Sequence, residues 1–211
     1  MRLLTPRVAK VVVATASTFP AIDLIRVLHA RNPDFVRQYD FASFMLAINV
    51  SGRWAFVFLL LALACTPVQR LVSSSWIPAV RRPLGLAAFG YCVLHFLAYF
   101  VVGQKLNLEY TIQDSLAQPS RLPGWVSLLL LVPLAATSTD GMARRLGGKR
   151  WKLLHRLVYL SAAAAIYHAY LVEAGRYGNY NTTRNTLIAF VVLMLARLLR
   201  FKRPVRRAPE T

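Results

Sequence analysis

Three histidines lie inside or at the edge of apolar stretches of the chain, and their side chains are the strongest candidates for chemistry. His95 lies in one such stretch, whereas His155 and His168 lie thirteen residues apart in another. Ionisable side chains are rare within membrane helices and usually mark a functional site. Hydrogen bonding to a neighbouring helix is the alternative role for each imidazole. The fourth histidine, His29, lies in the polar stretch HARNPD and is interpreted as an ordinary loop residue.

The depth of two of these histidines favours a shared site. At 1.5 Å per residue, His95 lies about 16 Å and His168 about 22 Å from the start of the predicted helix that carries it. The two imidazoles could therefore reach one level in the outer half of a bilayer. Neutral imidazole is an axial ligand of haem iron, and helix bundles house such cofactors in their interiors. We predict that His95 and His168 form a haem axial pair.

His155 belongs to a different level of the helix that carries His168. The two lie about 20 Å apart along the helix axis and about 140° apart around it. They cannot bind the same metal ion, but they could serve two stacked electron-transfer sites, one near each face of a membrane. His155 is thus a candidate for a second site or for an alternative ligand.

The helices that position these histidines are predicted to span a membrane. Of the 211 residues, 56% are hydrophobic and 16% are charged, and the net charge is +18. A disordered basic chain has few apolar residues, and a soluble nucleic-acid-binding protein needs a polar surface around its basic patch. The expected partner is therefore the lipid bilayer, and no nucleic acid is expected.

Six stretches approach the roughly 20 apolar residues that a transmembrane helix needs. They cover about residues 9–28, 46–66, 84–102, 124–139, 153–172 and 186–199. The first contains Pro20, Asp23 and Arg26, and the fourth and sixth are short. The sequence predicts an all-α fold, in which residues 1–211 form one membrane domain of six transmembrane helices with short loops and a basic tail at 200–211.

The distribution of cations predicts the orientation of this bundle. Of the 26 Lys and Arg residues, 18 fall on the side that holds both chain ends, including Arg197 and the tail, and 8 fall on the other. Most acidic residues lie with the smaller set. Because Lys and Arg gather in cytoplasmic segments, both ends are expected inside, which requires an even number of spans.

The densest cluster of cations lies between the fourth and fifth predicted spans. It comprises Arg144, Arg145, Lys149, Arg150 and Lys152. Holding the loop on the cytoplasmic side is a sufficient explanation for these charges. Alternatively, its glycines, the following helix N-terminus and the guanidinium groups could bind a phosphate. Arg145, Lys149 and Arg150 are therefore candidates for a flavin phosphate site or another anion site, such as one for a lipid head group.

Five segments stand out together by their order and spacing. They are SGRWA at 51–55, the span ending in Cys65-Thr66-Pro67, RRPLGLAAFGYCVLHFLAYF at 81–100, ATSTDGMARRLGGKRWKLLHRLVYL at 136–160 and IYHAYL at 166–171. These segments resemble the MsrQ (YedZ) family, the haem-binding membrane subunits of the bacterial periplasmic methionine sulfoxide reductase system. Any one of them alone would be unspecific, but the combination is specific. The family belongs to a broader group of ferric-reductase-like transmembrane proteins.

The resemblance implies a non-catalytic electron-transfer subunit in the bacterial inner membrane. Such a subunit passes quinol-derived electrons to a periplasmic molybdopterin-containing methionine sulfoxide reductase, which repairs oxidised periplasmic proteins. The implied cofactor is haem b, with the quinone pool or a flavin reductase as the donor and FMN as an associated flavin. By position, His95 and His168 match the family's haem ligands, and His155 matches a third functional histidine.

One position departs from the wider group. Two-haem relatives carry a second histidine thirteen residues before the first one on the third helix, where this chain has Arg82. The departure leaves room for a flavin, a quinone or a five-coordinate haem near His155, and it makes Arg82 a candidate cofactor-binding residue.

Two other functions remain open on the sequence alone. A small transporter or proton channel could use the histidines as relays, although no repeated halves are evident and Asp23 is the one acidic residue within the predicted spans. A membrane anchor or assembly factor without a redox cofactor is the other alternative, for which three membrane histidines would be superfluous.

Overall fold

The computed structural model describes residues 5–31, 41–72, 74–177 and 181–198. These residues form helices and turns, with no strand among them, which confirms the all-α prediction. The elements are α1 (Pro6–Ala16), α2 (Phe19–Arg31), α3 (Phe41–Leu71), α4 (Trp76–Leu97), η1 (Ala98–Gly103), α5 (Leu108–Ala117), α6 (Leu122–Ala136), α7 (Asp140–Leu146), α8 (Gly148–Leu154), α9 (Leu157–Tyr177) and α10 (Asn181–Leu198).

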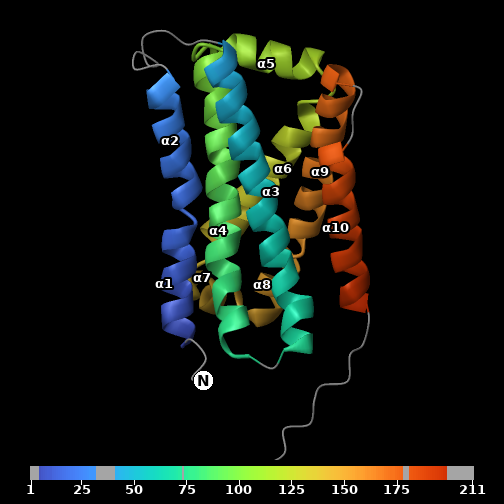
Figure 1. Cartoon of the computed structure of the whole chain (residues 1–211). Helices are drawn as coiled ribbons and strands as arrows, with labels where there is room; N and C mark the ends of the chain where they lie inside the picture. The colour runs from blue at the N-terminus through green and yellow to red at the C-terminus, as the bar shows by residue number, and fades with distance from the viewer. Residues whose placement is uncertain (1–4, 32–40, 73, 178–180, 199–211) are drawn as a thin grey trace, which may run out of the picture.

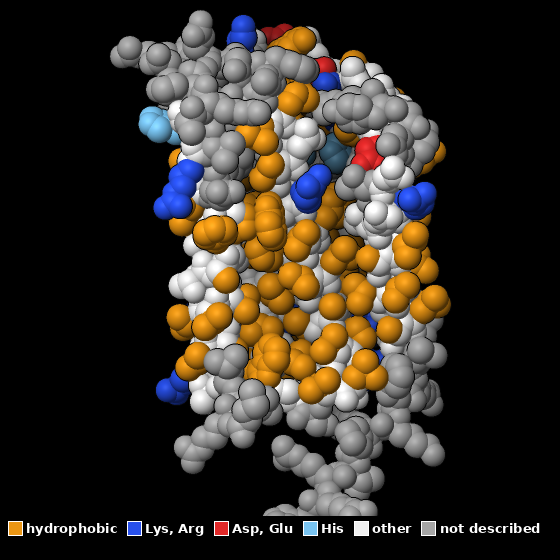
Figure 2. Space-filling view, in the orientation of Figure 1, with side chains coloured by type: hydrophobic (Ala, Val, Ile, Leu, Met, Phe, Trp, Pro, Cys, Tyr) orange, Lys and Arg blue, Asp and Glu red, His pale blue; other side chains and the backbone are white. Residues whose placement is uncertain are grey.

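The long helices run side by side, and the short ones lie at the two ends of the bundle. In Figure 1, α1 and α2 follow one another along one edge, and α5 lies across the upper end. The short helices α7 and α8 lie toward the opposite end. Figure 2 shows the middle of one face covered by hydrophobic side chains, with Lys and Arg mainly above and below them.

Among the described residues, three helical segments are long and apolar enough to cross a membrane: Phe44–Leu71, Trp76–Gly103 and Gly148–Gly175. The bent pair of α5 and α6, whose axes differ by 119°, raises the number to four if the pair is one span. The expected first and sixth spans are helical but do not meet the same criterion. The chain is therefore all-helical with three to four membrane-capable helices, and the full six-span topology stays a prediction.

The predicted first span is broken between α1 and α2. The Ser17 hydroxyl donates to the Ala14 carbonyl at 2.7 Å, and the Thr18 hydroxyl donates to the Thr15 carbonyl at 2.7 Å. Such side-chain bonds compete with the helical pattern, and Pro20 has no N–H to continue it. The hydroxyl of Tyr91, on α4, donates to the Ser17 carbonyl at 2.9 Å. This hydrogen bond gives a partner to a main-chain carbonyl at the break between the two helices.

Two helix pairs make up the centre of the bundle. The pair of α3 and α4 buries Phe58, Leu63 and Ala88 in the main hydrophobic core. The pair of α6 and α9 meets through the hydroxyls of Ser127 and Ser161, which lie 3.0 Å apart. Small polar residues of this kind allow membrane helices to approach closely. The cavities described below lie between these two pairs.

Two residues lie in settings that differ from those predicted from the sequence. His29 is exposed but lies in the last turn of α2 rather than in a loop. Arg197 was assigned to the cytoplasmic cations, yet its guanidinium reaches between helices, where it donates to the hydroxyl of Tyr159 and, at 2.6 Å, to the carbonyl of Leu63. A charge removed from water needs such partners, and here they tie α10 to α3 and α9.

Candidate functional site

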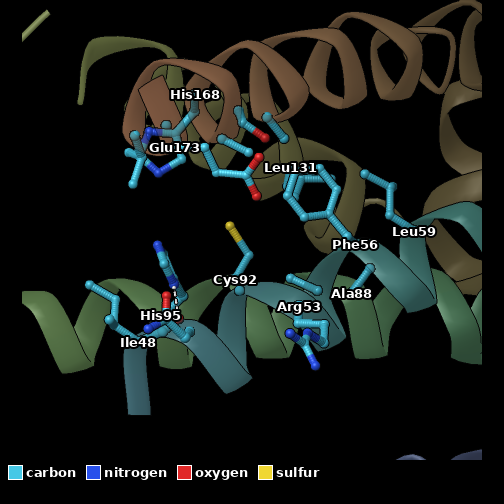
Figure 3. A pocket seen from close by; sticks show the side chains of 18 of the residues that line it. Ile48, Arg53, Phe56, Leu59, Ala88, Cys92, His95, Leu131, His168 and Glu173 are labelled. Atoms are coloured by element: carbon cyan, nitrogen blue, oxygen red, sulfur yellow. Dashed lines mark hydrogen bonds between the residues drawn. The ribbon is translucent and has the colours of Figure 1, made fainter. Parts of the chain in front are cut away.

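His95 on α4 and His168 on α9 point toward one another across a cavity (Figure 3). Their ring centres are 6.1 Å apart, and the ring planes are crossed at 83°. The bond from an imidazole nitrogen to a metal ion is about 2 Å long, so two imidazoles on opposite sides of one ion have ring centres roughly 6 Å apart. The structure therefore brings the predicted pair together at a separation that suits one shared metal ion.

Each imidazole is held by a main-chain carbonyl of a different segment, one on α3 and one in the turn before α6. The Nδ1 atom of His95 donates to the carbonyl of Ile48 at 2.8 Å, and that of His168 donates to the carbonyl of Ser120 at 2.6 Å. A carbonyl oxygen can only accept, so the proton resides on Nδ1 in both rings and Nε2 carries the lone pair. Histidines that ligate metals almost always have such a second partner.

The cavity beside the two rings has a volume of about 450 Å³ and is bounded by α3, α4, α6, α9 and the start of α10. Its walls include small residues from four helices. These are Gly52, Ala88, Gly124, Ala165 and Ala169. The volume lies within the range of about 300–1,000 Å³ that is usual for cofactor sites. The cavity and the two imidazoles thus fit a metal ion carried by a flat organic ligand such as haem.

The cavity lining changes in polarity along the bundle. The start of α3 and the end of α9 lie at the end of the bundle where α5 lies (Figure 1). Asn49 and Arg53, in the first half of α3, and Glu173, near the end of α9, line the cavity. Phe56, at the middle of α3, and Leu131, in the second half of α6, line it farther from that end. The site therefore has an apolar inner part that excludes water and a polar outer part that can meet charged groups of a ligand.

A second cavity, of about 300 Å³, lies toward the opposite end of the bundle and is lined by His155. The Nδ1 atom of His155 donates to the Trp151 carbonyl at 3.0 Å, and its ring stacks on the Trp151 indole with centres 3.9 Å apart. Its Nε2 atom is buried and has no hydrogen-bond partner. Leaving a buried polar atom unsatisfied costs about 1–3 kcal/mol, so a ligand that bonds to Nε2 would be favoured here.

Arg82 lines the same second cavity as His155. Its guanidinium donates to the exposed Asp140 carboxylate at 2.6 Å, which joins α4 to the start of α7. This hydrogen bond holds the pKa of Asp140 below its usual range. Because a guanidinium carries five donors and no acceptor, Arg82 suits an anionic or carbonyl ligand and not a metal ion.

The three basic residues proposed for a phosphate lie elsewhere. Arg145, on α7, and Lys149 and Arg150, on α8, are exposed, and none of them lines either cavity. Gly147 joins the two short helices with φ of +73°, a conformation that favours glycine. The indole Nε1 of Trp151 donates to the Thr137 carbonyl at 3.0 Å, which fixes α8 against the end of α6. The basic cluster therefore faces outward, while Trp151 and His155 face inward.

Sequence reasoning missed several residues of the site. Cys92 lines the first cavity, three residues before His95, and helical spacing alone could have placed it on the same face. The carbonyls of Ile48 and Ser120 could not have been found, because every residue has a carbonyl and no side-chain pattern marks the one that faces a histidine. Gly52 and Gly124 also touch the two imidazoles, and neither stands out in the sequence.

Comparisons with known proteins identify the family of this chain. The model of the family "Ferric reductase like transmembrane component" matches residues 51–166, a range that contains Arg82, His95 and His155 and ends two residues before His168. The heme-binding subunit MsrQ of the protein-methionine-sulfoxide reductase of Deinococcus radiodurans is 40% identical over 160 residues, which cover 76% of both chains.

Shorter matches extend to other proteins. The corresponding MsrQ subunit of Herminiimonas arsenicoxydans is 42% identical over 127 residues, which are 60% of this chain and 58% of that protein. The magnetosome protein MamZ of Magnetospirillum gryphiswaldense is 44% identical over 117 residues, 56% of this chain but 18% of MamZ. The chain thus spans little more than half of some relatives and three quarters of another. These matches show that the chain belongs to the ferric-reductase-like transmembrane family and, within it, to the MsrQ group.

Proposed function

We propose that this chain is a haem b-binding membrane subunit that transfers electrons across the bacterial inner membrane. The observation that carries the proposal is the facing pair of His95 and His168, each fixed by a carbonyl as the tautomer that ligates through Nε2. The relatives' name, heme-binding subunit, supports the same cofactor. Membership in a family of redox membrane proteins favours this function over a histidine-relay channel or a cofactor-free anchor.

In this proposal the chain's own residues hold and insulate the cofactor. His95 and His168 would hold the haem iron through their Nε2 atoms, and the haem would supply reversible one-electron storage. The apolar inner wall, including Phe56 and Leu131, keeps water away from the metal. Arg53 lines the polar part of the cavity, where the carboxylate groups of haem b would find a cation. Neutral imidazoles and a dry pocket together favour electron transfer without ligand exchange.

The second cavity is the proposed place of electron entry. Its histidine, His155, has a buried Nε2 without a partner, and Arg82 and Trp151 line the same space. An indole face and hydrogen-bond donors suit the planar carbonyl-bearing ring of a quinone or a flavin. We propose that quinol, or a flavin supplied by a reductase, reduces the protein at this end.

The proposed direction of transfer follows from charge and position. The end with α7 and α8 carries the basic cluster and is assigned to the cytoplasm. The end with α5 then faces the periplasm, with α1 and α2 as one span and α10 as the last. The electron acceptor in this proposal is a periplasmic molybdopterin-containing methionine sulfoxide reductase subunit, in keeping with the relatives' name.

Optical spectra of the purified protein test the haem proposal. After haem-replete expression, the detergent-solubilised protein should show a b-type Soret band and, on dithionite reduction, a sharp α-band of low-spin haem. His95→Ala and His168→Ala should each abolish the low-spin spectrum, whereas His29→Ala, a change at an exposed histidine, should leave it intact. A colourless wild-type protein would overturn the proposed function.

A further inference from the structure

Two glycines on different helices lie directly against the two facing histidine rings. A Cβ atom built on Gly52 of α3 would lie 3.0 Å from Nδ1 and 3.2 Å from Cε1 of His95. A Cβ atom built on Gly124 of α6 would lie 3.0 Å from Nδ1 and 3.2 Å from Cε1 of His168. All four distances are shorter than ordinary van der Waals contact. Each imidazole ring therefore occupies the space that the Cβ atom of any residue other than glycine would take at position 52 or 124.

The glycine and the carbonyl that holds each ring form one repeated unit. The carbonyl of Ile48 lies one helical turn before Gly52, and the carbonyl of Ser120 lies the same four residues before Gly124. In both units the hydrogen bond fixes one edge of the imidazole while the bare backbone of the glycine supports the ring. The unit occurs twice, in two segments without sequence similarity, which argues against a coincidence of packing.

Other glycines of the described chain do not share this environment. A Cβ atom on Gly85 or on Gly90, both within α4, would meet nothing within 4 Å. A Cβ atom on Gly103 would meet the aromatic rings of Phe44 and Tyr99. Close contact with a histidine is thus specific to Gly52 and Gly124 among the described glycines.

We infer that Gly52 and Gly124 are positioning residues that set the rotation of the two axial imidazoles and hold their planes crossed. The inference rests on the proposed haem ligation by His95 and His168. Each ring would be confined between the cofactor on its Nε2 side and the carbonyl and glycine on its Nδ1 side. In this inference, the angle of 83° between the ring planes results from the contacts that restrict the rotation of each ring.

Electron paramagnetic resonance of the ferric protein reports this angle directly. Crossed imidazole planes leave two iron d orbitals nearly equal in energy, which gives a strongly anisotropic low-spin signal with a high largest g value. Parallel planes separate these orbitals and give a rhombic signal with a lower largest g value. The wild type is expected to show the crossed-plane signal, and a rhombic signal would overturn the inference without any variant.

Single substitutions test the role of each glycine. In Gly52→Ala and in Gly124→Ala, the added methyl must displace a ring that is already hydrogen-bonded, so the largest g value should fall or the low-spin haem should be lost. Gly90→Ala adds the same methyl to a helix where it meets nothing and should leave the signal unchanged.

The outcomes separate this inference from the proposed function. A wild type without low-spin bis-histidine haem would overturn the function itself. A wild type with that haem, whose signal is identical in both alanine variants, would overturn only the role of the glycines. A changed signal in Gly52→Ala and Gly124→Ala, together with an unchanged one in Gly90→Ala, would support it.

Discussion

The carbonyl of Ser120 accepts a 2.6 Å hydrogen bond from Nδ1 of His168, so the turn that precedes α6 holds an imidazole that belongs to α9. That turn is itself fixed by an ion pair between Arg121 and Asp114, and Asp114 also accepts from the hydroxyl of Tyr99 at 2.7 Å. The helix that crosses the end of the bundle is therefore mechanically connected to the candidate haem ligand.

Removal of this ion pair should change the reduction potential of the haem. In Arg121→Met the turn loosens, the Nδ1 hydrogen bond of His168 weakens, and the imidazole becomes a poorer donor to ferric iron. A loss of about 1 kcal/mol corresponds to a rise of roughly 40 mV for a one-electron couple. Spectroelectrochemical titration would measure it. An unchanged potential in Arg121→Met would refute the connection, and Gln113→Ala, on the exposed side of α5, serves as the control.

The close approach of α6 and α9 predicts a graded effect on stability. Ser161 is fully buried, and its hydroxyl lies 3.0 Å from that of Ser127. Ser161→Ala should lower the free energy of unfolding by about 0.6 kcal/mol, the average for such bonds between membrane helices. Ser161→Leu should cost more, about 1–3 kcal/mol, because the larger side chain separates the helices. Thermal unfolding in detergent distinguishes them, and equal stability of the two variants would argue against tight packing here.

The ion pair between Arg82 and Asp140 predicts a dependence of stability on pH. The pKa of Asp140 is lowered by the hydrogen bond from Arg82. A carboxyl whose pKa is depressed in the folded state stabilises the protein above its unfolded pKa of about 3.9, and that contribution is lost as the pH falls through the folded value. The melting temperature of the wild type should thus exceed that of Asp140→Asn near neutral pH, and the difference should begin to shrink below about pH 4 and disappear once the pH lies below the lowered pKa of Asp140. A constant difference over this range would exclude the pair as its cause.

His155 should affect electron entry and leave the outer site untouched. Loss of one hydrogen bond, about 1–1.5 kcal/mol, corresponds to roughly tenfold weaker binding of a quinol. His155→Ala should therefore raise the quinol concentration needed for half-maximal haem reduction about tenfold, as followed by stopped-flow absorbance. The low-spin spectrum due to His95 and His168 should persist. An unaltered quinol dependence would remove His155 from the entry site.

The sequence predicted the features of this site that depend on residue type. Ionisable residues inside apolar stretches are rare, so His95, His155 and His168 stood out, and the helical rise placed the first and last of them at a similar depth. The structure brings these two together. Their ligation of haem remains a prediction.

Features that depend on contacts between helices could not be predicted from the sequence. The two imidazoles contact main-chain carbonyls and glycines. Neither kind of group has a side-chain pattern in the sequence that would mark it as the neighbour of a histidine. The residues between the predicted spans 84–102 and 124–139 were expected to form a loop, but Leu108, Ile112 and Leu116 recur at helical spacing, and the structure has α5 there. Arg197 was counted as a cytoplasmic charge because composition cannot reveal that its guanidinium reaches Tyr159 and Leu63.

The central claim, that His95 and His168 ligate the same haem, is tested most directly by changing the ligand type instead of removing it. Near-infrared magnetic circular dichroism of ferric haem distinguishes bis-histidine from histidine–methionine ligation by the position of a charge-transfer band. The wild type should show the bis-histidine band, and His95→Met and His168→Met should each move it to the histidine–methionine position. A band that keeps its bis-histidine position in either variant would contradict the assignment of that residue.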